Sequence, residues 1–185
     1  MTIDRYGEGR APRIDAGTDA GDALYFCNQS FWDVQNLELT SQDPAKPNDR
    51  TRRGVYVESR GSLVEHVHLA KLNIHDVRGL LAVGDDYNRG KDSAGIGFEV
   101  TDAASGARFH DIVVEGSDIY TIDSTGIFTK GAGGVYPRSA GWDAIKFTDV
   151  VLQDNTIHDI AKNAIVARQL DGGFIQRNRV WDTAY

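Results

Sequence analysis

The 185-residue sequence has one cysteine, four prolines and no apolar run long enough to cross a membrane. A single cysteine excludes an intrachain disulfide, and a membrane-spanning helix needs about 20 mainly apolar residues. An excess of positive charge is also missing, because the formal net charge is −7. Nucleic acids and anionic membranes are bound through basic surfaces, so we expect neither as a partner.

Helical periodicity is hard to find as well. Apolar residues alternate with polar ones in short runs that end at Gly, Asn, Asp or Ser, which is the pattern of many short strands. We predict early strands at residues 23–27, 34–40, 55–58 and 63–69. Loops are expected at residues 42–53, 85–95 and 131–141.

One strand–corner–strand phrase recurs along the chain. It occupies residues 72–83, 117–130 and 155–168, and a shortened copy occupies residues 178–183. Aligning the copies gives three apolar columns: Ile74, Ile119, Ile157 and Val180; Val67, Ile112 and Val150; and Leu69, Val114, Leu152 and Ile175. A unit of about 22 residues cannot bury its own apolar face, whereas stacked units can, and this favours a solenoid.

The repeated pattern N-x-I-x-D, followed by Gly and alternating apolar residues, resembles the right-handed parallel β-helix repeat of the pectate-lyase-like superfamily. The resemblance covers residues 20–185 and implies one all-β domain, residues 1–185, with three parallel sheets and an irregular start at residues 1–19. Capping elements usual in this superfamily are not recognisable, so we expect a chain truncated at both ends whose uncapped ends self-associate. A β-sandwich is the alternative fold, but it would not repeat one phrase with stacked anchors.

The strand after each corner presents every second residue outward. We expect two outward columns: Tyr25, Tyr56, Leu81, Phe128 and Val166; and Cys27, Glu58, Val83, Lys130 and Arg168. The functional interpretation is a groove for sugar rings lined by Tyr56 and Phe128, with Tyr87 added from the neighbouring loop. The structural interpretation is that the inserted loops simply bury this strip.

Lys130 and Arg168 should be neighbours on adjacent coils. Lyases of the superfamily that the chain resembles remove the proton beside a uronate carboxylate with a basic side chain, and Arg, Lys or Ca²⁺ neutralises that carboxylate. Because an arginine disfavours a charged lysine beside it, we predict Lys130 as the base and Arg168 as the carboxylate's partner. Glu58 is a further catalytic candidate, and Asp85 and Asp86 offer oxygen ligands for Ca²⁺.

The expected function is therefore a polysaccharide lyase that acts on a uronate-containing extracellular polysaccharide. The parent protein would be secreted or at the cell surface, although no signal-peptide pattern follows Met1. A glycoside hydrolase is one alternative and needs two carboxyl groups roughly 5–5.5 or 6.5–9.5 Å apart. The candidates for such a pair are Glu58, Asp85, Asp86, Glu99 and Asp123. A non-catalytic shaft or carbohydrate-binding module is the other alternative, disfavoured by the three inserted loops.

Other polar and aromatic residues also follow the repeat. A third outward column should stack Glu38, His75, Tyr120, His158 and Trp181 as a stiffening ladder or a binding platform. We expect left-handed corners at Asn73, Asn155 and Asn178. His66 and His68 share a strand face, but the sequence shows no third metal ligand beside them.

Overall fold

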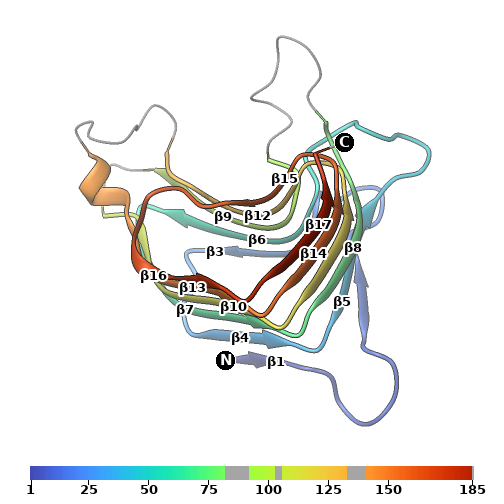
Figure 1. Cartoon of the computed structure of the whole chain (residues 1–185), viewed down its shortest axis with the longest axis horizontal. Helices are drawn as coiled ribbons and strands as arrows, with labels where there is room; N and C mark the ends of the chain where they lie inside the picture. Colours follow the sequence, from blue (N-terminus) through green and yellow to red (C-terminus); the bar gives the residue numbers. More distant parts are fainter. Residues whose placement is uncertain (82–91, 103–105, 133–140, 185) are drawn as a thin grey trace.

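The computed structural model describes residues 1–81, 92–102, 106–132 and 141–184. Short strands wind in successive coils and form three sheets in which all pairing is parallel (Figure 1). Within those residues, the helical element is the 3₁₀ helix η3 (Trp142–Ile145). The predicted parallel β-helix is confirmed, and residues 1–15 form a partial first coil with β1 and β2.

Each sheet takes one strand from every coil it spans. Sheet A contains β1 (Thr2–Ile3), β4 (Trp32–Gln35), β7 (Leu63–Ala70), β10 (Arg108–Glu115), β13 (Phe147–Gln153) and β16 (Leu170–Gln176). Sheet B contains β2 (Arg13–Asp15), β5 (Glu38–Gln42), β8 (Asn73–Arg78), β11 (Asp118–Ile122), β14 (Thr156–Ile160) and β17 (Arg179–Thr183). Sheet C contains β3 (Asp22–Cys27), β6 (Arg53–Arg60), β9 (Ala94–Asp102), β12 (Thr125–Lys130) and β15 (Asn163–Val166).

The core runs along the axis between the three sheets. Ile74, Ile119, Ile157 and Val180 pair in register on neighbouring strands of sheet B, as predicted. The first three are completely buried, whereas Val180, on the edge strand β17, is 47% exposed. The two columns predicted in sheet A are also in register. Stacking of like apolar residues, coil upon coil, therefore builds this core.

Two strand predictions were wrong. Residues 34–40 form not one strand but the end of β4 and the start of β5, because Asn36 adopts a left-handed conformation (φ 57°) and turns the chain from sheet A into sheet B. The sheet C strand of the third coil is β9, not the stretch around Leu81 and Val83. Ile96 of β9 takes the place opposite Val55, so the inserted residues precede this strand instead of following it.

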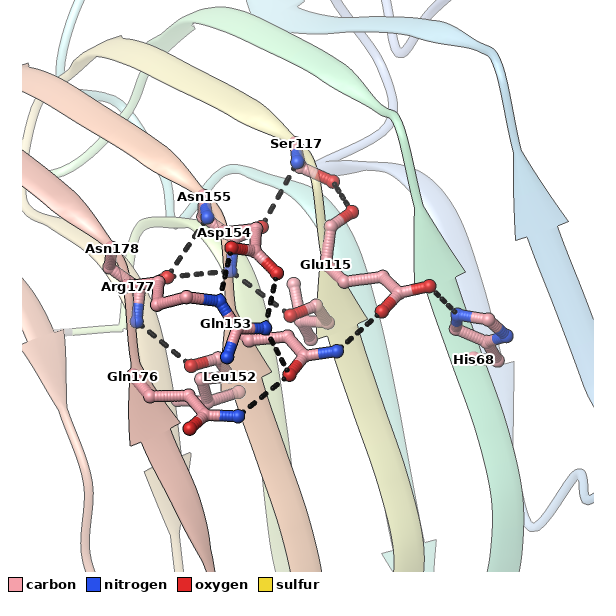
Figure 2. Close-up of polar contacts among 11 residues, drawn as sticks. His68, Glu115, Ser117, Leu152, Gln153, Asp154, Asn155, Gln176, Arg177 and Asn178 are labelled. Atoms are coloured by element: carbon pink, nitrogen blue, oxygen red, sulfur yellow. Dashed lines mark hydrogen bonds and ion pairs between the residues drawn. The ribbon is translucent and has the colours of Figure 1, made fainter.

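Left-handed residues occur at the same place in successive coils. The corner from sheet A to sheet B uses Asn36, Lys71, Gly116, Asp154 and Arg177. The prediction of left-handed backbone at Asn73, Asn155 and Asn178 is therefore wrong. The left-handed residue of each of these corners lies one or two positions earlier. Asn155 instead lies buried beside the corner, where its side chain accepts from the Ser117 N–H (3.0 Å) and donates to the Val114 carbonyl (3.0 Å; Figure 2). It bonds neighbouring coils together rather than its own turn.

Candidate functional site

The outer face of sheet C carries the two columns that the sequence predicted, except in the third coil. There Gly97 and Glu99 take the places predicted for Leu81 and Val83. Tyr25, Tyr56, Gly97, Phe128 and Val166 stand in register in the first column. Cys27, Glu58, Glu99 and Lys130 stand in register in the second. Glu99 therefore occupies the place that we had assigned to Val83, and it lies between the strands that carry Glu58 and Lys130.

The aromatic residues of this face do not form an open surface. Tyr56 and Phe128 are both buried, and the Tyr56 ring stacks on Tyr25 at a centroid distance of 5.5 Å. The Arg53 guanidinium lies 3.3 Å from the centroid of the Tyr56 ring, which adds a cation–π contact. A Cβ on Gly97 would stand 2.4 Å from the Phe128 ring, so the ring covers this glycine. The predicted aromatic lining of a sugar groove by Tyr56 and Phe128 is thus wrong, because their rings are used in packing.

Glu58 is held by three neighbours. Thr101 Oγ1 donates to Oε1 at 2.5 Å, Arg60 contacts both carboxylate oxygens at 2.9 and 3.0 Å, and the Tyr25 hydroxyl also donates to this carboxylate. Burial would raise the pKa of Glu58, but these hydrogen bonds outweigh burial and lower it. With its side chain only 4% exposed, Glu58 is poorly placed to touch a substrate. It fastens neighbouring coils, and its predicted catalytic role is not supported by this geometry.

Lys130 lies between two other carboxylates. Its Nζ is 2.8 Å from Asp92 Oδ1 and 3.0 Å from Glu99 Oε1, and the Tyr56 hydroxyl donates to Glu99 Oε2 at 2.9 Å. Burial favours the neutral lysine, but the two carboxylates outweigh burial and raise the pKa of Lys130. We had expected its charged form to be disfavoured, and that expectation was wrong. A lysine held as an ammonium ion is a poor base for β-elimination.

The backbone of Arg168 is bonded to Thr129, the residue before Lys130. Its N–H donates to Thr129 Oγ1 at 2.7 Å, and the same hydroxyl donates to the Arg168 carbonyl at 2.7 Å. The Arg168 residue is exposed, and β15 already ends at Val166, so the paired strands stop short of it. The other predicted site residues, Asp85, Asp86 and Tyr87, lie outside the described residues.

The described part of the chain contains no group of three His, Cys, Asp or Glu side chains arranged to hold a metal ion. The predicted calcium site at Asp85 and Asp86 is therefore neither supported nor contradicted by these residues. No helix among the described residues is long and apolar enough to span a membrane.

Asp92 and Glu99 are two partly exposed carboxyl groups on this side of the coil. Their side chains are 30% and 15% exposed, and both contact the same ammonium group. Two oxygens bound to one nitrogen at these distances lie less than about 6 Å apart, close to the roughly 5–5.5 Å carboxyl spacing of retaining glycosidases. The arrangement can therefore supply a nucleophile and a proton donor to one bond.

The sequence contained a signal for Glu99 that our alignment missed. The pentapeptide Gly-h-x-h-Glu, where h is apolar, occurs at residues 54–58 and again at residues 95–99, and residues 126–130 resemble it with Thr in the fourth place and Lys in the last. The three glycines lie where a Cβ would stand 2.4–2.8 Å from an isoleucine side chain of the core. Asp92 has no such signal, because it precedes the strand and reaches Lys130 from a connection between coils.

The third predicted column is confirmed on the outer face of sheet B. His75, Tyr120, His158 and Trp181 stack with centroid distances of 5.0, 5.1 and 4.4 Å and nearly parallel planes. Asp76 and Asp159 bind the Nδ1 atoms of the two histidines at 2.8 Å. Because each ring covers the face of the next, the column is a stiffening ladder more than a platform for a ligand.

Comparison with known proteins finds a match among solved structures but none among family profiles or curated sequences. No protein-family profile matches the chain, and no curated protein matches its sequence. Among solved structures, it is similar to a GH136 lacto-N-biosidase from Eubacterium ramulus, with a TM-score of 0.81 and 19% sequence identity. The match covers 99% of this chain but only 35% of that enzyme, so the chain spans about a third of the length of this structure. At this identity the likeness establishes the fold; membership of the pectate-lyase-like superfamily is not established.

Proposed function

We propose that this chain carries the catalytic carboxyl pair of a glycoside hydrolase, formed by Asp92 and Glu99. The observation that carries the proposal is that both partly exposed carboxylates contact one ammonium group, that of Lys130, at 2.8 and 3.0 Å. The fold is also that of a solved glycosidase, which favours hydrolysis over the β-elimination suggested by the sequence resemblance. The substrate would be an oligosaccharide or polysaccharide.

We assign different roles to the two carboxyl groups. Glu99 accepts from the Tyr56 hydroxyl and from Lys130, which fix its orientation. Glu99 would attack the anomeric carbon, and Asp92, in its protonated form, would give its proton to the leaving glycosidic oxygen. Water activated by Asp92 would then release the sugar from Glu99. Because the two groups are close, the product should keep the anomeric configuration of the substrate.

The test is hydrolysis of a panel of neutral oligosaccharides that includes one containing lacto-N-biose, with products followed by proton NMR. Glu99→Gln and Asp92→Asn should each lower the rate by about 10²–10⁴-fold without changing the thermal midpoint by more than a few degrees. Glu115→Gln is the matched control, because Glu115 lies in a comparable hydrogen-bonded setting on sheet A.

Three results would contradict the proposal: no hydrolysis by the parent chain across the panel, full activity in both carboxyl variants, or a product of inverted configuration. Glycan binding without hydrolysis would instead favour the alternative of a non-catalytic β-helix.

A further inference from the structure

A second surface of interest lies on the outer face of sheet A, around Phe31. The residues that align with Phe31 on later coils all have a left-handed backbone, as Phe31 itself does (φ 63°): His66, Asp111, Asp149 and Gly172. The fold therefore imposes this conformation on the position. Glycine accepts it freely and aspartate tolerates it, whereas for a bulky side chain it is rare. Phe31 is the residue of this column least suited to its backbone.

The Phe31 ring contributes little packing that would offset its unfavourable backbone conformation. It is 55% exposed and stacks on the His66 imidazole at a centroid distance of 6.0 Å with planes 23° apart. Its backbone N–H donates to the Glu65 carbonyl at 3.0 Å, a bond that any residue except proline would make. The strained position thus presents a flat apolar surface to solvent.

Asp33, near Phe31 in the sequence, faces two imidazoles without a direct hydrogen bond to either. Asp33 Oδ1 lies 3.7 Å from His66 Nε2 and 3.6 Å from His68 Nδ1, too far for direct hydrogen bonds. The opposite ring nitrogens are fixed by carboxylates, His66 Nδ1 by Asp111 at 2.9 Å and His68 Nε2 by Glu115 at 3.0 Å. Both imidazoles are therefore oriented toward Asp33, and a hydroxyl or water on the solvent side could bond to Asp33 and to an imidazole nitrogen together.

We propose that Phe31, Asp33, His66 and His68 form a sugar-binding site separate from the carboxyl pair of sheet C. A pyranose packs its C–H face on the Phe31 ring, and its hydroxyl groups bond to Asp33 and the two imidazoles from the solvent side. The carboxylates of Asp33 and Asp111 beside the ring disfavour an acidic sugar, so the ligand is a neutral one. Sheets A and C face different sides of the coil (Figure 1), so this site does not depend on the proposed hydrolase activity.

The experiment measures binding by saturation-transfer NMR and calorimetry. The probes are neutral hexasaccharides of β-linked glucose, α-linked glucose and β-linked N-acetylglucosamine, with a galacturonate hexasaccharide for comparison. Phe31→Ala should weaken binding of a neutral probe about tenfold, the worth of one aromatic contact, and Asp33→Asn should weaken it further. Phe174→Ala, which removes an exposed phenylalanine of the same sheet, should leave binding unchanged.

Phe31→Gly separates binding from packing. It should weaken binding about as much as Phe31→Ala does while leaving the thermal midpoint equal or higher, because glycine relieves the left-handed backbone. A clear fall in the midpoint would show that the ring is a packing element and would overturn the proposal. So would the absence of binding to every neutral probe, stronger binding of the galacturonate probe, or neutral binding that survives both Phe31→Ala and Asp33→Asn.

Discussion

At the scale of single residues, the carboxylates of sheet C differ in what surrounds them. Glu58 and Glu99 hold matching places on β6 and β9. Glu58 is enclosed by Arg60, Thr101 and Tyr25, whereas Glu99 keeps part of its surface open beside Lys130. Because its carboxylate is buried and hydrogen-bonded, Glu58 should stabilise the folded chain. That stabilisation should depend on pH, because the same hydrogen bonds lower the pKa of Glu58.

We predict that Glu58→Gln lowers the free energy of unfolding by about 1–3 kcal/mol near pH 7, the worth of buried hydrogen bonds to a charged group. The pKa of Glu58 is lowered in the folded chain from its ordinary value of 4.5. The stabilisation is therefore complete above that pH and is lost as the pH falls through the lower, folded-state pKa. Urea unfolding of parent and variant from pH 7 to pH 3 measures the difference, which should shrink below pH 4.5.

Glu65→Gln serves as the control for this experiment, because the Glu65 carboxylate accepts no hydrogen bond from the described residues. Its effect on stability should be small at every pH. A Glu58→Gln variant whose deficit stays constant down to pH 3 would refute the link between stability and this carboxylate.

At the scale of strands and corners, stability comes from columns that repeat from coil to coil. Inside sheet B the column is apolar, and beside the corner between sheets A and B it is polar. Ser117, Asn155 and Asn178 occupy matching places there, and Asn178 Oδ1 accepts from both the backbone and the side chain of Asn155. Figure 2 shows this ladder next to a second row of contacts from Gln176 through Gln153 and Glu115 to His68.

The apolar column gives a prediction with an internal control. Ile157→Ala should cost about 2–5 kcal/mol, since the side chain is fully buried between Ile119 and Val180. Val180→Ala, in the same column but half exposed, should cost clearly less. Chemical denaturation of both variants tests this, and equal losses would show that burial along the column is not what stabilises these coils.

Substitution within the polar ladder should also lower the free energy of unfolding. Asn155→Ala leaves the Ser117 N–H and the Val114 carbonyl without their buried partner, at a cost of about 1–3 kcal/mol for each unsatisfied group. Asn163→Ala, at an exposed place on β15, should change stability by less than about 0.5 kcal/mol. Hydrogen exchange at the Ser117 amide reports the same change locally, and unchanged protection in Asn155→Ala would be the contrary result.

At the scale of the whole molecule, the last coil leaves large apolar side chains exposed. Phe174, Ile175, Val180 and Trp181 are each exposed by 44% or more, and β15, β16 and β17 are edge strands. Unpaired strand edges beside apolar side chains are templates for association. Self-association of the 185-residue chain therefore stays a prediction.

Sedimentation equilibrium from micromolar to millimolar concentration should reveal an average mass that rises with concentration. Ile175→Lys should suppress that rise, because it places charge on the exposed edge strand β16, while Leu63→Lys, elsewhere on the surface, should not. A constant monomer mass over this range would contradict the predicted self-association.

The sequence by itself determined the coil. The spacing of seven between Val67 and Ile74, kept at Ile112 and Ile119 and at Val150 and Ile157, predicts which residues lie inward, because alternation within a strand and repetition between coils leave one register that buries them all. Inserted residues do not disturb that register, so the core could be predicted despite loops of unequal length.

Only the tertiary structure decided the site. Tyr56 meets Glu99 across 43 positions and Lys130 meets Asp92 across 38, and such pairs depend on where each insertion leaves and rejoins the coil. Placing the second insertion before β9 brings Glu99 beside Lys130 and moves Val83 away from this column. An ammonium between two carboxylates then acquires a raised pKa, the reverse of what an arginine neighbour would cause. The pKa values of side chains on this surface depend on contacts between coils. The periodicity of the sequence does not predict those contacts.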